Sequence, residues 1–580
     1  MTADESLDPV TLSVIRGQVT QLTNEMDLTL VNSAFSPIIC EANDMASGVF
    51  RPDGRTISQG DFGLPIFVGN MEFTVTAIAE EFECNIEPGD VFMTNDPYVG
   101  GTHLLDMTLV KPYFHEGELV GFIANTGHWT DIGSASPGGF TGGTTEIFQE
   151  GIRVMPVKLF EGGEPNEDLL ELVLTNVRRS EDIRGDYKAQ LNALSVGEER
   201  MDSLVEEFGA ETVQVAIEEL EDRSEREMRS RIEEIPDGSY TFVDRMDNDG
   251  VRDAPLEIDL ELTVDGSDVM LDFTGSSPPC RGPVNAPRSC TVSACNIAFK
   301  HVYPEIPINA GCFAPLEFTI PEETFINAKP PRPTMGYTES SQRILDTAFG
   351  ALAQAIPEDV PAQSFSTSFG MSMGGETEEG DFVFAYAVSG GYGGSSTQDG
   401  LSHATPPYAR ARMPSVEVLE DQYPLRFHEK RLRPDSAGPG RRRGGLGTRY
   451  DIEVRCDKAT FSCVGDRGNY PPSGVAGGKP AKGSVLGFVR GGDEYTPPLR
   501  TKEQDLELSS SDRIRIESPG GGGYGPPTER EPTRVRRDVE LGYVTARHAE
   551  EAYGVVVERS EDGIRVDDAE TEALREQMDE

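Results

Sequence analysis

MTLVKPYFHEGELVGFIAN, residues 107–125, contains two apolar runs separated by a polar segment with a glycine, Gly117. A glycine between two such runs is typical of the tight turn of a β-hairpin. With the turn centred on Glu116-Gly117, Asp106 would face residue 127 of the opposite strand and His103 would face residue 130. The pattern therefore predicts an antiparallel hairpin whose open end carries polar side chains.

Metal-ligating residue types flank this hairpin on both sides. NDPYVGGTHLLD (95–106) places His103 and Asp106 just before the first strand, and TGHWTD (126–131) places His128 and Asp131 just after the second. Opposed positions in a strand pair lie about 5 Å apart, and a set of histidines and carboxylates suits a divalent transition metal. The alternative is that the histidines cap turns while Asp106 fixes the local backbone. Spacing alone leaves both interpretations open and favours the metal only slightly.

Several other acidic residues could complete a coordination shell or act as general acid and base. They are Glu41 and Asp44 in CEANDMAS, Asp96, Glu146 and Glu150.

Other known site patterns are absent from the sequence. Gly100-Gly101 is followed by a strand and by no lysine at P-loop spacing, so it does not predict a phosphate cradle. GVAGGKPAKGS (474–484) and GGGGYG (520–525) also lack a nucleotide-binding frame, so ATP is not expected to bind this chain itself. DRMDNDG (244–250) is more simply a turn than a calcium loop. No GxSxG elbow is present, and Cys40 is better explained as a buried thiol than as a nucleophile.

The charge balance is strongly acidic, with 100 Asp and Glu against 51 Lys and Arg and a net charge of −49. Such a chain repels nucleic acid and anionic lipid, so neither is an expected partner. The acids are spread along the whole chain, as in proteins of a salt-loaded cytoplasm, where short Debye lengths make self-repulsion tolerable. There is no apolar stretch of membrane-helix length, no signal-peptide pattern near the N-terminus and no CxxC pair among eight cysteines. We therefore expect a cytoplasmic, halophilic protein with reduced cysteines; the alternative is an ordinary acidic enzyme.

Apolar periodicity predicts a mixed α+β protein with many segments and antiparallel sheets. Helices are expected from Asp8-Pro9 to about residue 34, over 71–83, through much of 166–234, and near 289–302 and 342–356; hairpins are expected around the DG turns at Gly54 and Gly266. Four regions follow from the changes in composition: an N-terminal metal-binding region (1–235), a β-rich region with two short helices (236–415), a Gly/Pro/Arg-rich β region with ordered loops (416–527) and a charged helical tail (528–580).

Ordered motifs along nearly the whole chain resemble the hydantoinase B/oxoprolinase family, which includes N-methylhydantoinase B and the acetone carboxylase alpha subunit. They span roughly residues 8 to 555 and include NDPYVGGTHLLDMTLV, GHWTDIG, EIFQEGIRVMPVKL, LTNVRRSEDIRGDYKAQLNAL, LDFTGSSPPCRGPVN, RPDSAGPGRRRGGLG and SPGGGGYGPPTER.

The resemblance implies a B-type subunit of an ATP-dependent hydrolase that acts on C–N bonds of cyclic amides such as hydantoins or lactams. Its A-type partner would bind ATP, which agrees with the missing P-loop. The family's divalent metal, manganese, zinc or iron, would be held by His103, Asp106 and His128, with Asp131 orienting a ligand histidine. Two alternatives remain: the alpha subunit of a carboxylase that acts on a ketone, and a metal-binding partner subunit without turnover of its own.

Two segments depart from the family pattern. A histidine-rich HIPVH-type segment is replaced by GLPIFVGNM (63–71), in which Gly63 and Phe67 stand at the two histidine positions. The ERxDFSC-type segment appears as CEANDMASG (40–48), without its arginine and cysteine. These departures leave the substrate open among lactams, imides and ketones.

Overall fold

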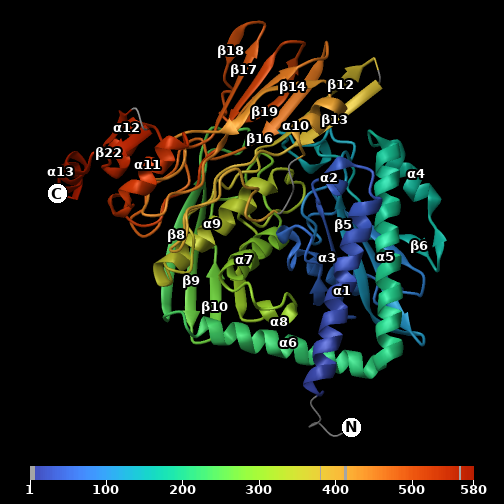
Figure 1. Ribbon diagram of the computed structural model, residues 1–580. Helices are drawn as coiled ribbons and strands as arrows, with labels where there is room; N and C mark the ends of the chain where they lie inside the picture. Colours follow the sequence, from blue (N-terminus) through green and yellow to red (C-terminus); the bar gives the residue numbers. More distant parts are fainter. Residues whose placement is uncertain (1–6, 379, 410–413, 561–562, 580) are drawn as a thin grey trace.

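The predicted hairpin lies in the middle of a seven-stranded sheet in the computed structural model, which describes residues 7–378, 380–409, 414–560 and 563–579 (Figure 1). The strand order is β2-β1-β5-β4-β3-β6-β7, and every pairing in this sheet is antiparallel. The strands are β1 (Met45–Phe50), β2 (Thr56–Gln59), β3 (Val91–Thr94), β4 (Asp106–His115), β5 (Glu118–His128), β6 (Val157–Glu161) and β7 (Glu164–Pro165).

The hairpin confirms the predicted turn but differs from the predicted register by one residue. His115 pairs with Glu118 next to the turn, as expected, whereas Asp106 pairs with His128 rather than with residue 127. The register shifts between Tyr113 and Phe114, where the opposite strand contributes one extra residue. Such a β-bulge cannot be seen in a pattern of alternating apolar residues, and it sets the two ligand-type side chains directly opposite each other.

Long helices cover one face of this sheet. The helix α1 (Pro9–Ser33) begins as predicted, because the Asp8 side chain accepts hydrogen bonds from the backbone amides of Val10 and Thr11. It lies beside α5 (Ser180–Phe208), and α6 (Ala210–Ile232) crosses below both (Figure 1). The shorter helices of this part are α2 (Pro37–Cys40), α3 (Asn70–Glu81), α4 (Glu167–Thr175) and the 3-10 turns η1 (Pro65–Phe67) and η2 (Ile147–Gln149).

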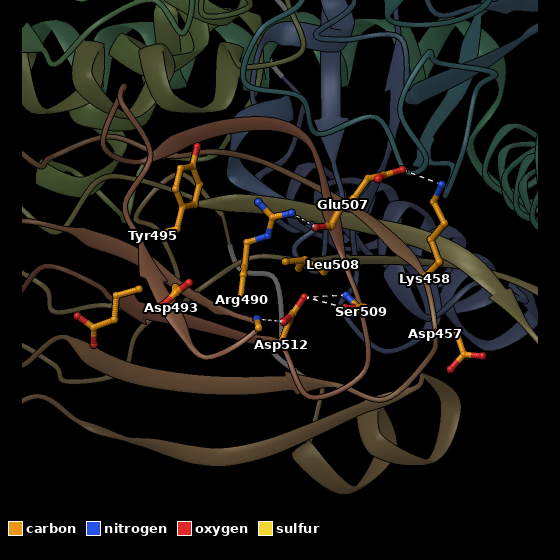
Figure 2. Close-up of a pocket in the computed structure, with 11 residues that line it drawn as sticks. Asp457, Lys458, Arg490, Asp493, Tyr495, Glu507, Leu508, Ser509 and Asp512 are labelled. Atoms are coloured by element: carbon orange, nitrogen blue, oxygen red, sulfur yellow. Dashed lines mark hydrogen bonds and ion pairs between the residues drawn. The ribbon is translucent and has the colours of Figure 1, made fainter.

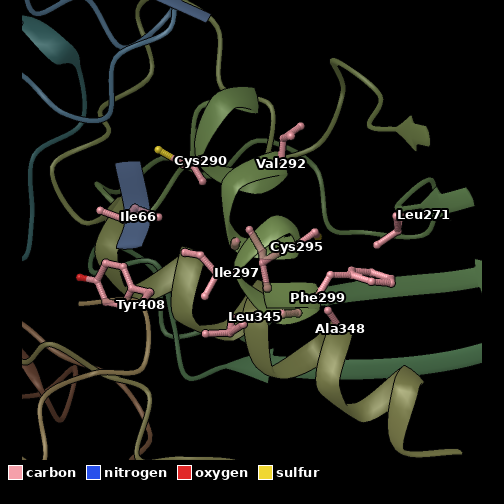
Figure 3. Packing of buried hydrophobic residues seen from close by; sticks show 14 of the residues in the cluster. Ile66, Leu271, Cys290, Val292, Cys295, Ile297, Phe299, Leu345, Ala348 and Tyr408 are labelled. Atoms are coloured by element: carbon pink, nitrogen blue, oxygen red, sulfur yellow. The ribbon is translucent and has the colours of Figure 1, made fainter. Parts of the chain in front are cut away.

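A second layer places two buried helices between the first sheet and a four-stranded sheet. This sheet has the order β11-β10-β9-β8, and the predicted turn at Gly266 joins two of its strands. Apolar side chains of α7 and α9 pack against it, as Figure 3 shows for Phe299, Ala348 and Leu271. The elements are β8 (Gly238–Met246), β9 (Leu256–Asp265), β10 (Asp268–Asp272), α7 (Arg288–Val302), α8 (Ala310–Phe313), β11 (Leu316–Thr319) and α9 (Tyr337–Ala355).

Two further sheets and a small helical unit form the C-terminal half. The first sheet has the order β13-β12-β16-β19 and joins segments on both sides of residue 415; the second has the order β14-β15-β20-β17-β18. The division into four regions stays a prediction. The elements are β12 (Gly370–Thr377), β13 (Gly380–Tyr386), α10 (Val416–Gln422), β14 (Leu425–Leu432), β15 (Thr448–Val454), β16 (Ala459–Val464), β17 (Val485–Arg490), β18 (Asp493–Tyr495), β19 (Lys502–Leu508), β20 (Arg513–Glu517), η3 (Pro527–Glu529), α11 (Pro532–Glu540), α12 (Ala546–Tyr553), β21 (Val557–Ser560), β22 (Gly563–Val566) and α13 (Asp568–Asp579).

The Gly/Pro/Arg-rich segments are ordered and pack backbone against backbone. Gly521 donates its amide to Gly445 O (3.0 Å) and accepts from the amide of Gly438 (2.8 Å). A β-carbon on Gly521 would lie 2.0 Å from Tyr392 O, which leaves no room for a side chain. Glycine is therefore required here by the close approach of three chain segments. Among the described residues, no helix is both long and apolar enough to cross a membrane.

We expect Gly521→Ala to lower the free energy of unfolding by about 3 kcal/mol or more, because the methyl group meets rigid backbone atoms. The matched control is Gly17→Ala in α1, where a β-carbon meets nothing within 4 Å. Glycine in an exposed helix interior costs roughly 0.5–1 kcal/mol relative to alanine, so this variant should gain stability. Denaturant unfolding of both variants measures the difference, and equal effects would contradict the packing described here.

Candidate metal centre

Three neighbouring strands bring ligand-type residues to one end of the first sheet. Asp106 begins β4, His128 ends β5, and Asp44 immediately precedes β1. The amide of His128 donates a hydrogen bond to Asp44 O (3.1 Å), and Asp106 lies directly opposite His128. Residues from three segments of the chain thus meet at one point.

The glycine turn before β4 positions His103. The amide of Gly101 donates to Asp96 O (3.0 Å), and Gly100 adopts a φ of +143°, close to the backbone of α3. A β-carbon on Gly100 would lie 2.4 Å from Thr74 N, so only glycine fits. The turn then closes with a hydrogen bond from the amide of Asp106 to His103 O (3.2 Å).

One ligand atom from each of His103, Asp106 and His128 lies within 4.8 Å of the other two. The residues are 1%, 3% and 2% exposed. Both ring nitrogens of each histidine and Oδ1 of Asp106 have no hydrogen-bond partner among the described residues. His103 Nε2 lies 3.2 Å from Asp106 Oδ2, but this ion contact lacks hydrogen-bond geometry. A role of the histidines as turn caps would require such bonds, whereas unpartnered nitrogens and a carboxylate oxygen converging on one point fit a metal ion.

Burial sets the protonation of these groups. It lowers the pKa of His128 to about 4, although the Asp106 carboxylate opposes the shift, so the imidazole is neutral and able to bind a metal at neutral pH. Burial also raises the pKa of Asp106, but the neighbouring histidines and the Thr102 hydroxyl outweigh it and leave this pKa below its usual range. Burial and the Asp106 carboxylate together raise the pKa of Asp44 well above its usual range.

Aromatic rings enclose the two histidines. The ring of Phe140 stacks on His128 with centroids 6.0 Å apart and an interplanar angle of 15°. The ring of Tyr337 meets His103 edge-on at 4.9 Å and 74°. These contacts fix the imidazole planes and keep water away from them.

The helix α5 holds the hairpin from behind. Gln190 donates from Nε2 to Met107 O (2.8 Å) and to Asn125 Oδ1 (3.1 Å), and its Oε1 accepts from the Trp129 indole (3.0 Å). One fully buried side chain thus ties both strands and the loop after His128 to the helix.

Two predicted catalytic residues do not join the site. Asp131 is buried, but its carboxylate accepts hydrogen bonds from the amides of Gly133 and Gly138 and from the backbone and guanidinium of Arg178. It therefore braces the loop and does not orient a histidine, because the chain turns away after Trp129. Glu41 is exposed at the end of α2.

The other predicted acidic residues lie outside the group formed by His103, Asp106 and His128. Glu150 is buried and accepts from the amides of Thr334 and Met335 (2.8 and 3.0 Å) and from the Thr144 hydroxyl (2.9 Å). Burial raises the pKa of Glu150 to about 7. Asp96 binds Arg153 (2.9 Å), and Glu146 is exposed at η2. Of the candidate acid and base residues outside the ligand set, Asp44 alone lies where the three strands converge.

Sequence reasoning missed Phe140 and Tyr337. They come from a loop and from the start of α9, far apart in the sequence. No spacing rule connects such positions. The buried polar run TESSQR (338–343) at the start of α9 was a usable signal, since a helix whose polar residues are all buried faces an interior site.

The segment that departs from the family pattern packs tightly beside the site. A β-carbon on Gly63 would lie 2.8 Å from Ala46 Cβ, so a histidine does not fit here without a backbone shift. Phe67 is 1% exposed within the apolar cluster that also contains Ile66. The chain fills with apolar atoms the positions at which the resemblance led us to expect histidines.

A separate open cavity of 660 Å³ lies near β17 and β18 and is lined by charged residues such as Asp457, Arg490 and Asp493 (Figure 2). Two of its cationic side chains are paired: Lys458 lies 2.6 Å from Glu507, and Arg490 donates to Glu507 O (2.9 Å). It contains no histidine or cysteine and none of the residues described above.

A family model described as Hydantoinase B/oxoprolinase matches residues 8–527. An uncharacterised protein of Methanocaldococcus jannaschii is 34% identical, and the match covers 98% of this chain and 100% of that protein. The B-type subunit of a putative D-/L-hydantoinase from a Pseudomonas species is 32% identical, over 98% of each chain. The beta chain of the caprolactamase of Pseudomonas jessenii is also 32% identical, over 98% and 99% of the two chains.

Two solved structures share the fold. The ATP-dependent caprolactamase of Pseudomonas jessenii superposes with a TM-score of 0.91 at 30% identity, covering 99% of this chain and 100% of that one. A nucleotide-free acetone carboxylase gives a TM-score of 0.90 at 24% identity, over 99% and 83%. The predicted α+β class is confirmed by these matches.

We expect His103→Ala and Asp106→Ala to lower the affinity for Mn²⁺, Zn²⁺ or Fe²⁺ at least tenfold, because each removes one of three converging ligand atoms. The matched control is His115→Ala, at the opposite end of the same strand, which should keep full metal content. Elemental analysis after dialysis against each metal provides the measurement. Less than a tenth of an equivalent in the wild type would refute the site.

Proposed function

The chain belongs to the hydantoinase B/oxoprolinase family, and from this premise we propose that it is the B-type subunit of an ATP-dependent cyclic amide hydrolase. It would open the ring of a hydantoin or lactam at the centre formed by His103, Asp106 and His128, in complex with an A-type ATPase subunit. The observation that carries this proposal is the buried convergence of three ligand atoms that have no other partner. The relatives named as parts of a hydantoinase and of a caprolactamase support the reaction class.

The three residues would hold a divalent metal, which when bound polarises the carbonyl of a cyclic amide. Asp44 would serve as the general acid or base of the reaction, because its carboxyl group lies beside Asp106 and outside the three-residue set. The surrounding aromatic rings exclude bulk water, which strengthens each electrostatic interaction in the site.

ATP is assigned to the partner subunit. The chain contains no P-loop, and its glycine-rich segments are filled by the backbones of neighbouring segments rather than open to a phosphate, as at Gly521 and Gly445. The partner would phosphorylate the amide oxygen and turn an unreactive group into one that water can attack.

We expect the chain, purified with its A-type partner and loaded with metal, to open at least one of hydantoin, N-methylhydantoin, 5-oxoproline and ε-caprolactam. Ring opening should consume ATP and should not depend on bicarbonate. Chromatography of the products with and without ¹³C-bicarbonate provides the measurement. A labelled carboxylated product from acetone would assign the chain to a carboxylase instead, and tight metal binding without any turnover would make it a non-catalytic subunit.

We expect Asp44→Asn to lower kcat at least 100-fold while metal content stays at the wild-type value, because a general acid or base contributes about 10²–10⁴-fold. The variant keeps the backbone carbonyl of residue 44 that binds His128 N. Glu41→Gln is the matched control in the same segment, and its exposed side chain should have no effect. Equal rates for both variants would remove Asp44 from the reaction.

A further inference from the structure

One fully buried side chain of α5 lies against both hairpin strands, next to the ligand pair. Gln190 donates from Nε2 to Met107 O (2.8 Å). A β-carbon on Gly127 would lie 3.3 Å from Gln190 Cδ, so the side-chain amide lies directly against this strand as well. Met107 pairs with Gly127 in the hairpin, and the next pair along the strands is Asp106 with His128. Gln190 therefore contacts both strands one residue away from two of the three candidate ligands.

The same side chain holds the segment on the other side of His128. Trp129 follows His128 directly, and its indole donates to Gln190 Oε1 (3.0 Å). Asn125 accepts from Gln190 Nε2 (3.1 Å) and donates from Nδ2 to the backbone carbonyl of residue 190 (2.8 Å). Both polar atoms of the Gln190 side chain thus bind groups that flank a candidate ligand.

A second buried side chain of α5 holds the segment that leads to Asp44. Asp186 lies four residues before Gln190, which places both side chains on one face of the helix. Its Oδ1 accepts the amide of Ser36 (2.9 Å), the residue before α2. The amide of Asp44 in turn donates to Ile38 O of α2 (3.0 Å). The helix α5, which packs against β4 and β5 (Figure 1), therefore supports all three segments that meet at the candidate metal centre.

Packing alone does not explain a glutamine at position 190. Methionine is an unbranched side chain that adapts to the space available in a core. It would, however, leave Met107 O and the Trp129 indole without their buried partner, because it offers neither a strong donor nor a strong acceptor. An amide supplies both at one point, and it therefore connects the two strand ends to each other as well as to the helix.

We propose that Gln190 is a positioning residue of the candidate metal centre. By holding Met107 and Trp129 it fixes the neighbouring ligands, and thereby the coordination geometry of the bound ion. It acts through these residues and is not itself a ligand. The inference rests on the proposed function for the presence of the metal, and it adds the group that determines how the metal is held. Hydrogen-bonding groups behind metal ligands typically change metal affinity about 10- to 100-fold when they are removed.

The test uses the full-length chain and Co²⁺, whose visible absorption depends on the number and arrangement of its ligands. Gln190→Met should lower the affinity for Co²⁺ about 10- to 100-fold and should change the absorption spectrum of the bound ion, because Asp106 and His128 lose their common support. Titrations well below the Tm of each variant ensure that the chain is folded, so that lower stability alone does not change the result.

Lys111→Met is the matched control, because it makes the same replacement at another contact between β4 and α5. Lys111 Nζ lies 2.6 Å from Glu198 Oε2, five residues along the strand from Asp106. This variant should keep the affinity and the spectrum of the wild type. If Gln190→Met does not fold, Trp129→Phe decides instead, since it removes only the indole donor beside His128; it should change the spectrum and lower the affinity about threefold or more.

The inference alone is overturned by an unchanged spectrum in the deciding variant, by an affinity within twofold of the wild type, or by equal changes in Lys111→Met. A wild-type chain that binds no metal overturns the metal centre, and with it both the proposed function and this inference. A wild-type chain that binds Co²⁺ but, with its A-type partner, opens no cyclic amide overturns the proposed function, whereas the spectra still decide the role of Gln190.

Discussion

The pairing of β4 with β5 is the constraint on which the candidate site depends. The bulge at Tyr113 shifts the register by one residue, so that Asp106 faces His128 across the strand pair. Without this shift, strand alternation would place the two side chains on opposite faces of the sheet. Gln190 then holds both strands against α5, so that the packing of the N-terminal half and the geometry of the site depend on the same hydrogen bonds.

Glycine and aromatic residues also determine the geometry of the candidate site. Gly100 and Gly101 let the chain turn sharply enough to deliver His103 beside Asp106, at positions where a β-carbon would touch backbone. Phe140 and Tyr337 then close the site from two other parts of the chain. Because α9, which carries Tyr337, also packs on the second sheet, the two layers of the molecule are joined at the site itself.

The hairpin, its turn and the first helix were predictable because local signals determine them: the apolar runs, Gly117, and Asp8 as N-cap. The convergence of His103, Asp106 and His128 was also predictable, since all three flank one hairpin. The exact register of the two strands was not predictable, because a bulge depends on packing across the strands rather than on the residues that form it. Asp131 shows that a residue with the spacing of a ligand need not bind the metal. In the structure the carboxylate of Asp131 pairs with Arg178. Only tertiary contacts decide whether such a residue joins the metal site or an ion pair.

The charges inside the site explain why a cation, rather than a proton, fits best. Other buried aspartates pair with cationic side chains, as Asp346 does with Arg467 and Asp466 with Lys502. Asp27, which has no such ion pair among the described residues, instead has its pKa raised by burial to about 7, so that a proton neutralises it.

Asp106 follows neither route. No Lys or Arg pairs with it in the described chain, and its side chain instead faces the two histidines. The ring nitrogens of both histidines and Oδ1 of Asp106 have no hydrogen-bond partner among the described residues. A divalent cation bound by two imidazoles and a carboxylate would use these atoms together.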